Sequence, residues 1–219
     1  MAFSQWTFSI ETSPSLTASL TSTTPLEESS SVIITAVDDV SKWAFGYTPG
    51  LVKDCVYVKA LFKTVSGGNT WNSLGIFAQS QGAFSTAANA YSMTIHNGLF
   101  GAAGPIVLHK GTLSAALQDN TGVSNATITI PASNVCVAMG LKCEHDTTSG
   151  NMFLTALFDP GPISIPVGST YAFPGLASQC TYLDTASPYV TGVTFGIFGR
   201  NAAGATLTQK FDLIVVNTD

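Results

Sequence analysis

Charged side chains are scarce in this sequence. Only 10% of its 219 residues are charged, against about 25% in an average soluble protein, and the net charge is −5. Arg200 is the only arginine, and no run of basic residues occurs. Because nucleic-acid binding needs a basic stripe that neutralises phosphates, we expect no nucleic-acid partner. A surface with so few charges repels copies of itself weakly, which suits a subunit packed among neighbours.

Long apolar runs are also missing. No stretch of about 18 apolar residues occurs, so we expect no membrane-spanning segment and no membrane partner. The first residues, MAFSQWTFSIETS, lack the basic segment followed by an apolar one that a secretory signal requires. We therefore expect synthesis in a cytosol without export.

Cysteine pairs with metal-site spacing are absent as well. The four cysteines are Cys55, Cys136, Cys143 and Cys180, and none forms a CxxC pair that would indicate zinc. Cys136 and Cys143 are seven residues apart in one expected strand, so they should point to opposite faces. The sequence predicts reduced, mostly buried thiols.

Catalytic motifs are not found either. The GxSxG nucleophile elbow of serine hydrolases is missing. A glycosidase would need two carboxylates that flank the sugar. The nearest approach is Glu144-His145-Asp146, where Glu144 and Asp146 share a face of a strand, but a third carboxylate is missing. We expect a solvated strand end there, and a chain that is not an enzyme.

Metal ligands are equally sparse. His96 and His109 are expected on facing strands, where a cross-strand polar pair is a better interpretation than a metal pair without a third ligand. Clustered oxygens for calcium occur only at Asp38-Asp39 and at Asp146 with Asn151. The sequence therefore predicts no catalytic, cofactor-binding or metal-binding residues and no cofactor, and it leaves any ligand-binding residues unknown.

A helical period is missing, and a period of two takes its place. Gly, Pro and Asn turns separate the alternating runs. Alternation predicts strands over residues 3–12, 32–37, 55–65, 71–79, 91–95, 105–110, 127–130, 135–144, 152–158, 193–198 and 211–216. We expect an all-β protein: one antiparallel β-sandwich or jelly-roll domain over residues 1–219.

Three segments between these strands receive other interpretations. Residues 13–31 are rich in Ser and Thr and predict a polar hairpin or a surface arm. Residues 38–50 mix turn residues with Trp43, Phe45 and Tyr47 and predict a loop whose aromatic cluster packs on the sandwich or is exposed. Leu113 and Leu117 favour a short helical turn.

The pairing of the strands is predicted from turns and from two-sided hydrophobicity. Ser66-Gly67-Gly68-Asn69 predicts a hairpin that joins the strand over 55–65 to the one over 71–79. The ribbon Val190–Val216 predicts a second hairpin, closed by an Asn/Gly turn. Its last strand is apolar on both faces, so we expect it to be central and paired with residues 3–10, with the N- and C-terminal strands adjacent.

From Val56 to Val216 the chain resembles a concanavalin A-like lectin/glucanase domain of the laminin G-like type. The resemblance rests on the order and spacing of several strand pairs. Among these pieces are YSMTI with IVLHKG, the pair over 137–143 and 151–158, and FGIFG followed by FDLIVV. The resemblance implies the same closure of the chain ends. It does not define a function, because this fold occurs in lectins, glycosidases, adhesion modules and virus particle proteins.

We expect first a structural protein of a bacteriophage particle, either capsid decoration or a tail or fibre component, located in the virion. Its partners would be other virion proteins and further copies of itself as a homo-oligomer. The alternative is a carbohydrate-binding, lectin-like module with a glycan partner. That function requires exposed aromatics for sugar stacking, and the candidates are Trp43, Tyr47, Trp71 and Tyr182.

Overall fold

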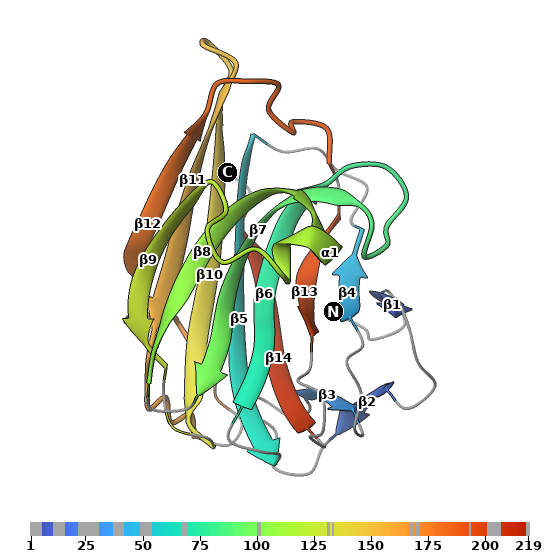
Figure 1. Cartoon of the computed structure of the whole chain (residues 1–219), viewed down its shortest axis with the longest axis vertical. Helices are drawn as coiled ribbons and strands as arrows, with labels where there is room; N and C mark the ends of the chain where they lie inside the picture. The colour runs from blue at the N-terminus through green and yellow to red at the C-terminus, as the bar shows by residue number, and fades with distance from the viewer. Residues whose placement is uncertain are drawn as a thin grey trace.

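Two antiparallel sheets of seven strands each face one another as a β-sandwich in the computed structural model of the chain (Figure 1). The structure describes residues 6–10, 16–21, 31–36, 42–48, 54–66, 70–99, 102–130, 132, 134–166, 169, 171–192, 194–200 and 207–217. The all-β antiparallel sandwich expected from the sequence is confirmed.

The first sheet, sheet A, lies toward the viewer in Figure 1. Its strands in spatial order are β1 (Trp6–Ile10), β4 (Lys42–Tyr47), β13 (Thr194–Arg200), β6 (Thr70–Ser80), β7 (Asn89–Leu99), β8 (Ala103–Thr112) and β9 (Ser124–Thr129). The helix α1 (Leu113–Ala116) follows β8 directly and lies over the outer face of this sheet.

The second sheet, sheet B, lies behind it. Its strands in spatial order are β12 (Ala177–Asp184), β11 (Asn151–Asp159), β10 (Cys136–Asp146), β5 (Cys55–Ser66), β14 (Leu207–Asn217), β3 (Ser31–Ala36) and β2 (Leu16–Thr21). In the part of the chain that is described, no helix is long and apolar enough to cross a membrane.

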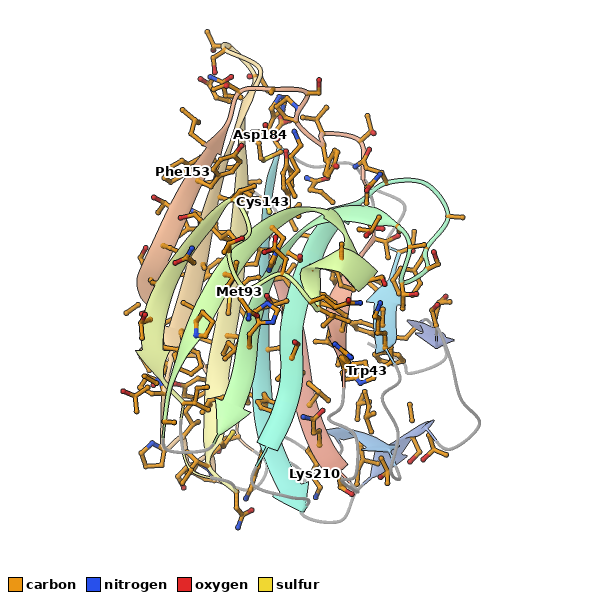
Figure 2. The ribbon with its side chains drawn as sticks, viewed as in Figure 1. Trp43, Met93, Cys143, Phe153, Asp184 and Lys210 are labelled. Carbon is orange, nitrogen blue, oxygen red and sulfur yellow. The ribbon has the colours of Figure 1, made fainter. Side chains whose placement is uncertain are left out.

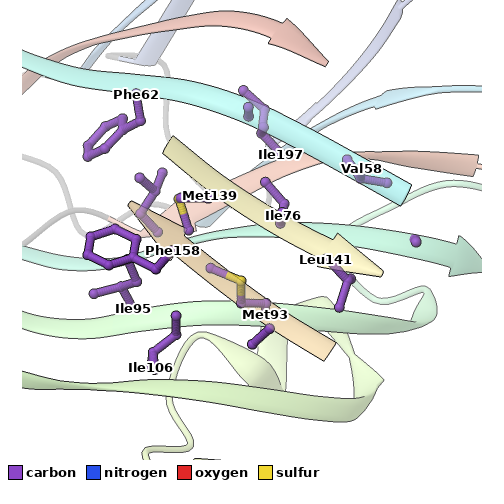
Figure 3. Packing of buried hydrophobic residues seen from close by; sticks show 14 of the residues in the cluster. Val58, Phe62, Ile76, Met93, Ile95, Ile106, Met139, Leu141, Phe158 and Ile197 are labelled. Carbon is purple, nitrogen blue, oxygen red and sulfur yellow. The ribbon is translucent and has the colours of Figure 1, made fainter. Parts of the chain in front are cut away.

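The main core fills the space between the two sheets, and its residues come from alternate positions of each strand. Figure 3 shows side chains of β5, β10 and β11 meeting those of β6, β7, β8 and β13. The inward set expected on β10 is confirmed: Val137, Met139, Leu141 and Cys143 are all buried in this core. Period-two alternation thus places each strand's apolar face correctly.

The outer faces of both sheets are partly covered. On sheet A, α1 and the segment after it bury Phe77 and Phe198 together with Leu113 and Leu117. Thr112 caps the helix, since its side-chain oxygen accepts a hydrogen bond from the backbone N–H of Ala115 at 3.2 Å. The short helical turn expected around residues 113–117 is confirmed.

On sheet B, apolar side chains of the segment after β11 lie against the outer face: Ile163, Ile165, Tyr171, Phe173 and Leu176. Phe173 and Leu176 pack there with Leu61, Cys136 and Ala138. Cys136 therefore lies on the outer face of β10, while Cys143 lies in the core between the sheets, as the spacing predicted. All four cysteines are free thiols, and three of them are buried.

The predicted hairpin over 190–216 is wrong. β13 pairs with β4 and β6 in sheet A, whereas β14 pairs with β3 and β5 in sheet B. The two strands therefore belong to different sheets. Both strands have an apolar face, and alternation alone does not say which sheet that face belongs to.

Two other strands that were expected to pair are separated in the same way. β5 lies in sheet B and β6 in sheet A, so these two strands do not pair as a hairpin. The central position of β14 is confirmed, since it lies between β5 and β3. It meets an early strand as expected, but that strand is β3; the pairing with residues 3–10 is wrong, because β1 pairs with β4 in the other sheet.

Three segments outside the predicted strands also form strands. Residues 42–47 form β4, with Trp43 and Phe45 in the main core, and not a loop packed on its surface. Residues 177–184 form β12, which pairs with β11 at the edge of sheet B. Residues 16–21 form β2, which pairs with β3. Asp38-Asp39 lies outside the described residues.

Candidate site on the outer face of sheet A

Polar and charged side chains form a row across the outer face of sheet A. The registers place Lys42 opposite Arg200, Arg200 opposite Ser73, and Ser73 opposite His96 on the neighbouring strands β4, β13, β6 and β7. Their chain neighbours point into the core between the sheets, so these side chains point outward. We call these four residues the polar row.

A chain of hydrogen bonds extends the polar row to β8. Ser73 Oγ lies 2.8 Å from the carbonyl oxygen of Leu117 and 2.9 Å from His96 Nδ1. Thr94 Oγ1 then lies 2.6 Å from His96 Nε2 and 2.7 Å from His109 Nε2. All four residues are buried, with exposed fractions of 4% or less.

The direction of each hydrogen bond in this network follows from the one group that can only accept, the Leu117 carbonyl. The carbonyl of Leu117 only accepts, so Ser73 donates to it and accepts a hydrogen bond from His96 Nδ1–H. His96 Nε2 is then unprotonated and accepts from the Thr94 hydroxyl, which in turn accepts from His109 Nε2–H. Two neutral imidazoles, each with one defined tautomer, satisfy every contact.

Burial keeps both imidazoles neutral. It lowers the pKa of His96 to about 4, a shift that the more distant Asp119 carboxylate only partly opposes. Burial also lowers the pKa of His109 to about 4, and the neighbouring His96 lowers it further, against the opposing effect of Asp119. The two rings, 5.7 Å apart, would repel one another if both were charged.

Asp119 lies beside the far end of this chain of hydrogen bonds, but the tautomer assigned to His109 leaves its Nδ1 without a proton to donate. Its carboxylate lies 3.9 Å from His109 Nδ1, the ring nitrogen that faces away from Thr94. Hydrogen bonds from the side chain and backbone of Thr121 and from the backbone of Gly122 lower the pKa of Asp119 to about 2. Gly122 has a φ of +55° and approaches the Leu108 carbonyl so closely that a Cβ would clash there. The cover segment, residues 113–122, is thus held down at Leu117 by the Ser73 hydroxyl and at Gly122 by its close approach to β8.

Lys42 and Arg200 occupy the open end of the polar row, where both side chains are partly exposed. Lys42 Nζ donates to Ser114 Oγ of α1 at 2.5 Å. The Nε of Arg200 is buried and has no hydrogen-bond partner. None of the ion pairs among the described residues includes Arg200.

A second polar cluster lies near the upper end of the sandwich, where Figure 2 labels Asp184. The Asp184 carboxylate is fully buried and lies 2.7 Å from Lys110 Nζ and 2.6 Å from the Tyr91 hydroxyl. The Tyr91 oxygen also accepts from the backbone N–H of Tyr189 at 2.9 Å. Burial raises the pKa of Asp184, but hydrogen bonds from Lys110, Tyr91 and the Ala186 backbone outweigh it and hold that pKa low. This cluster fastens the loop after β12, and each of its members is engaged.

The carboxylates considered for glycosidase chemistry do not form an acid–base pair. Glu144 forms an exposed ion pair with Lys142 at 2.7 Å. Asp146 accepts from the Thr148 backbone and the Ser149 hydroxyl in the turn that follows it, and these hydrogen bonds lower its pKa. The prediction of a solvated strand end agrees with these contacts.

A calcium site does not fit the described residues. No group of three or more His, Cys, Asp or Glu side chains comes together among them in a way that would hold a metal ion. Asp146 is already committed to its turn.

The aromatics proposed for sugar stacking do not gather into one site. Trp43 is fully buried, so its exposure as a contact surface is ruled out. Tyr47 and Tyr182 are partly buried against the core, and the side chain of Trp71 lies outside the described residues. Among described aromatic residues only Phe153 is largely exposed, at 40%, on the outer face of sheet B near the margin seen in Figure 2.

The sequence predicts the two histidines as a cross-strand pair but does not indicate the residue that joins them. His109 stands opposite Ser92, not His96, and the bridge between the imidazoles is Thr94. Ser73, Thr94 and Asp119 carried no motif. The one available signal was that Ser92, Thr94 and His96 alternate with a fully apolar set on β7, a pattern that usually indicates a solvated face.

The architecture is that of lectin-like β-sandwich domains. No protein-family model matches the chain, and no curated protein matches it by sequence. Solved structures do match it over nearly its whole length. The protein named "Cellulose induced protein, Cip1" is 14% identical, with a TM-score of 0.58 over 100% of this chain and 94% of that one.

Two further matches are domains from carbohydrate-binding proteins. The exoplasmic/lumenal domain of VIP36, solved with Ca2+ and Man3GlcNAc bound, is 11% identical with a TM-score of 0.54, over 100% of this chain and 87% of that one. The carbohydrate recognition domain of Emp46p in a metal-free form is 12% identical with a TM-score of 0.52, over 95% of this chain and 88% of that one. At these identities the likeness shows the fold alone.

Proposed function

We propose that this protein is a carbohydrate-binding, lectin-like module. The observation that carries the proposal is the shared fold, which extends over nearly the whole of this chain and of domains that hold or recognise glycans. The open end of the polar row supports it, because the partly exposed cations Lys42 and Arg200 lie opposite one another there. Binding without catalysis is compatible with these neighbours.

A glycan array tests this function directly. We expect the full chain to bind at least one class of oligosaccharide, with binding that calorimetric titration reproduces in solution. The heat-unfolded chain serves as the control for adhesion to the array surface. An array without any hit, over neutral and acidic glycans alike, would contradict the proposal.

The bacteriophage structural role, with its virion location and homo-oligomer, stays a prediction from the sequence. Its support is the sparse charge of the chain. Analytical ultracentrifugation of the purified protein and co-sedimentation with phage particles would test it. A monomer that never sediments with particles would exclude it, whereas glycan binding alone would not.

A further inference from the structure

Arg200 is a partly buried cation that lacks a counter-charge within the described residues. Its Nε is buried without a hydrogen-bond partner, and the ion pairs of the described chain leave it out. A buried charged group loses its hydration by water, so a guanidinium group that is left there without a partner is energetically unfavourable. It is also the only arginine in a chain that has few charges of any kind.

A second cation faces Arg200 across the β4–β13 pair. The register sets Lys42 directly opposite it, which puts their Cβ atoms about 5 Å apart on one face of the sheet. Like charges directly opposite one another destabilise a sheet. Lys42 reaches toward α1 and donates to Ser114 Oγ, so α1 forms one wall beside the two cations.

An anion placed beside these side chains would give Arg200 the counter-charge that it lacks. The guanidinium group is a planar fork that bonds both oxygens of a carboxylate, which the ammonium of Lys42 then supports as a second charge. Both cations are partly exposed at the open end of the polar row, so the site can be reached from solvent. We propose that Arg200 and Lys42 bind the carboxylate of an acidic sugar, a uronic acid unit of a glycan.

This inference rests on the proposed carbohydrate binding and specifies its ligand. The test uses oligosaccharides of a uronic acid beside the same oligosaccharides after chemical reduction of their carboxyl groups to alcohols. We expect the wild-type chain to bind the acidic member at least about 10-fold more tightly than its neutral counterpart, as charge-assisted hydrogen bonds require.

The variant Arg200→Gln should lose this preference. We expect about 10- to 100-fold weaker binding of the acidic oligosaccharide, with little change for the neutral one. Arg200→Lys keeps the charge but not the fork, so its loss should be smaller. Lys142→Gln removes one positive charge from the outer face of sheet B and is the matched control, which we expect to bind as wild type does.

Thermal unfolding without ligand separates a binding role from a structural one. Because Arg200 is unpaired and faces Lys42, we expect the Tm of Arg200→Gln to stay at the wild-type value or rise. A lowered Tm would indicate that Arg200 supports the fold, and would overturn the assignment.

The remaining outcomes are also distinct. Equal binding of the acidic and reduced oligosaccharides, or unchanged binding by Arg200→Gln, overturns this inference and leaves carbohydrate binding standing. Binding of sulfated glycans without carboxylated ones overturns the carboxylate assignment. No binding of any glycan overturns the proposed function and this inference together.

Discussion

At the scale of single residues, burial decides what an ion pair contributes. Lys110 with Asp184 and Lys142 with Glu144 have the same N···O distance of 2.7 Å. The Asp184 side chain is 0% exposed, whereas that of Glu144 is 41% exposed. Removing one partner of a buried pair leaves an uncompensated charge, while an exposed pair is solvated and contributes little.

We therefore expect two equivalent substitutions, each of a carboxylate by its amide, to lower the free energy of unfolding by unequal amounts. Asp184→Asn should lower the free energy of unfolding by about 3 kcal/mol, because Lys110 loses its counter-charge, and lower the Tm by roughly 6–12 °C. Glu144→Gln should change the free energy of unfolding by less than about 1 kcal/mol. Urea unfolding of both variants at neutral pH is the measurement. Equal effects would mean that the Asp184 cluster is open to water.

At the scale of elements, the cover segment and the polar row depend on one another. Alternation on β7 predicted correctly that Ser92, Thr94 and His96 share a face, and the helical turn at residues 113–117 was also predicted. The sequence did not show that the second lies over the first, since that placement depends on the Ser73 hydrogen bond to Leu117 and on a tight turn at Gly122. Such contacts are long-range and leave no local pattern.

The buried histidines make the stability of this arrangement depend on pH. Each has a folded-state pKa of about 4 against an ordinary 6.5, so between these values the unfolded chain binds more protons than the folded one. Stability must then fall as the pH falls from about 6.5 toward 4. At pH 5 the loss is about 2 kcal/mol for each histidine.

We expect urea unfolding at pH 7 and at pH 5 to show this loss, and the double variant His96→Gln/His109→Gln to show much less of it. His145, the third histidine, lies at the end of β10 beside Asp54. His145→Gln is therefore the control and should keep the wild-type pH dependence. A double variant with an unchanged slope against pH would place the acid sensitivity in the carboxylates instead.

At the scale of the whole molecule, the sequence predicted the sandwich but not which strands are neighbours. The faces of β5 and β10 follow from alternation and are as predicted. Hairpins joined by short turns within one sheet, such as β10 with β11, were also found. The connections that change sheets were missed, because a crossing strand presents the same apolar face as a returning one. Only the packing of the core distinguishes a strand that crosses to the other sheet from one that returns within the same sheet.

Phe211 shows how the late strand β14 links the two sheets. It lies on sheet B, 3% exposed, with its ring 5.5 Å from that of Trp43 on sheet A and 5.3 Å from that of Phe62 on β5. Segments from opposite ends of the chain therefore share one aromatic cluster. If the sandwich is one cooperative unit, loosening this cluster must weaken both sheets at once.

We expect Phe211→Ala to lower the free energy of unfolding by about 3–5 kcal/mol through lost burial and a cavity at Trp43. Phe153→Ala removes the same side chain from the exposed face of sheet B and should cost less than about 1 kcal/mol. Native-state hydrogen exchange is the second measurement. In Phe211→Ala, protection should fall by a similar free energy in β6 and β7 of sheet A as in β5 of sheet B. Loss confined to β14 and its neighbours, with sheet A fully protected, would show that the two sheets open separately.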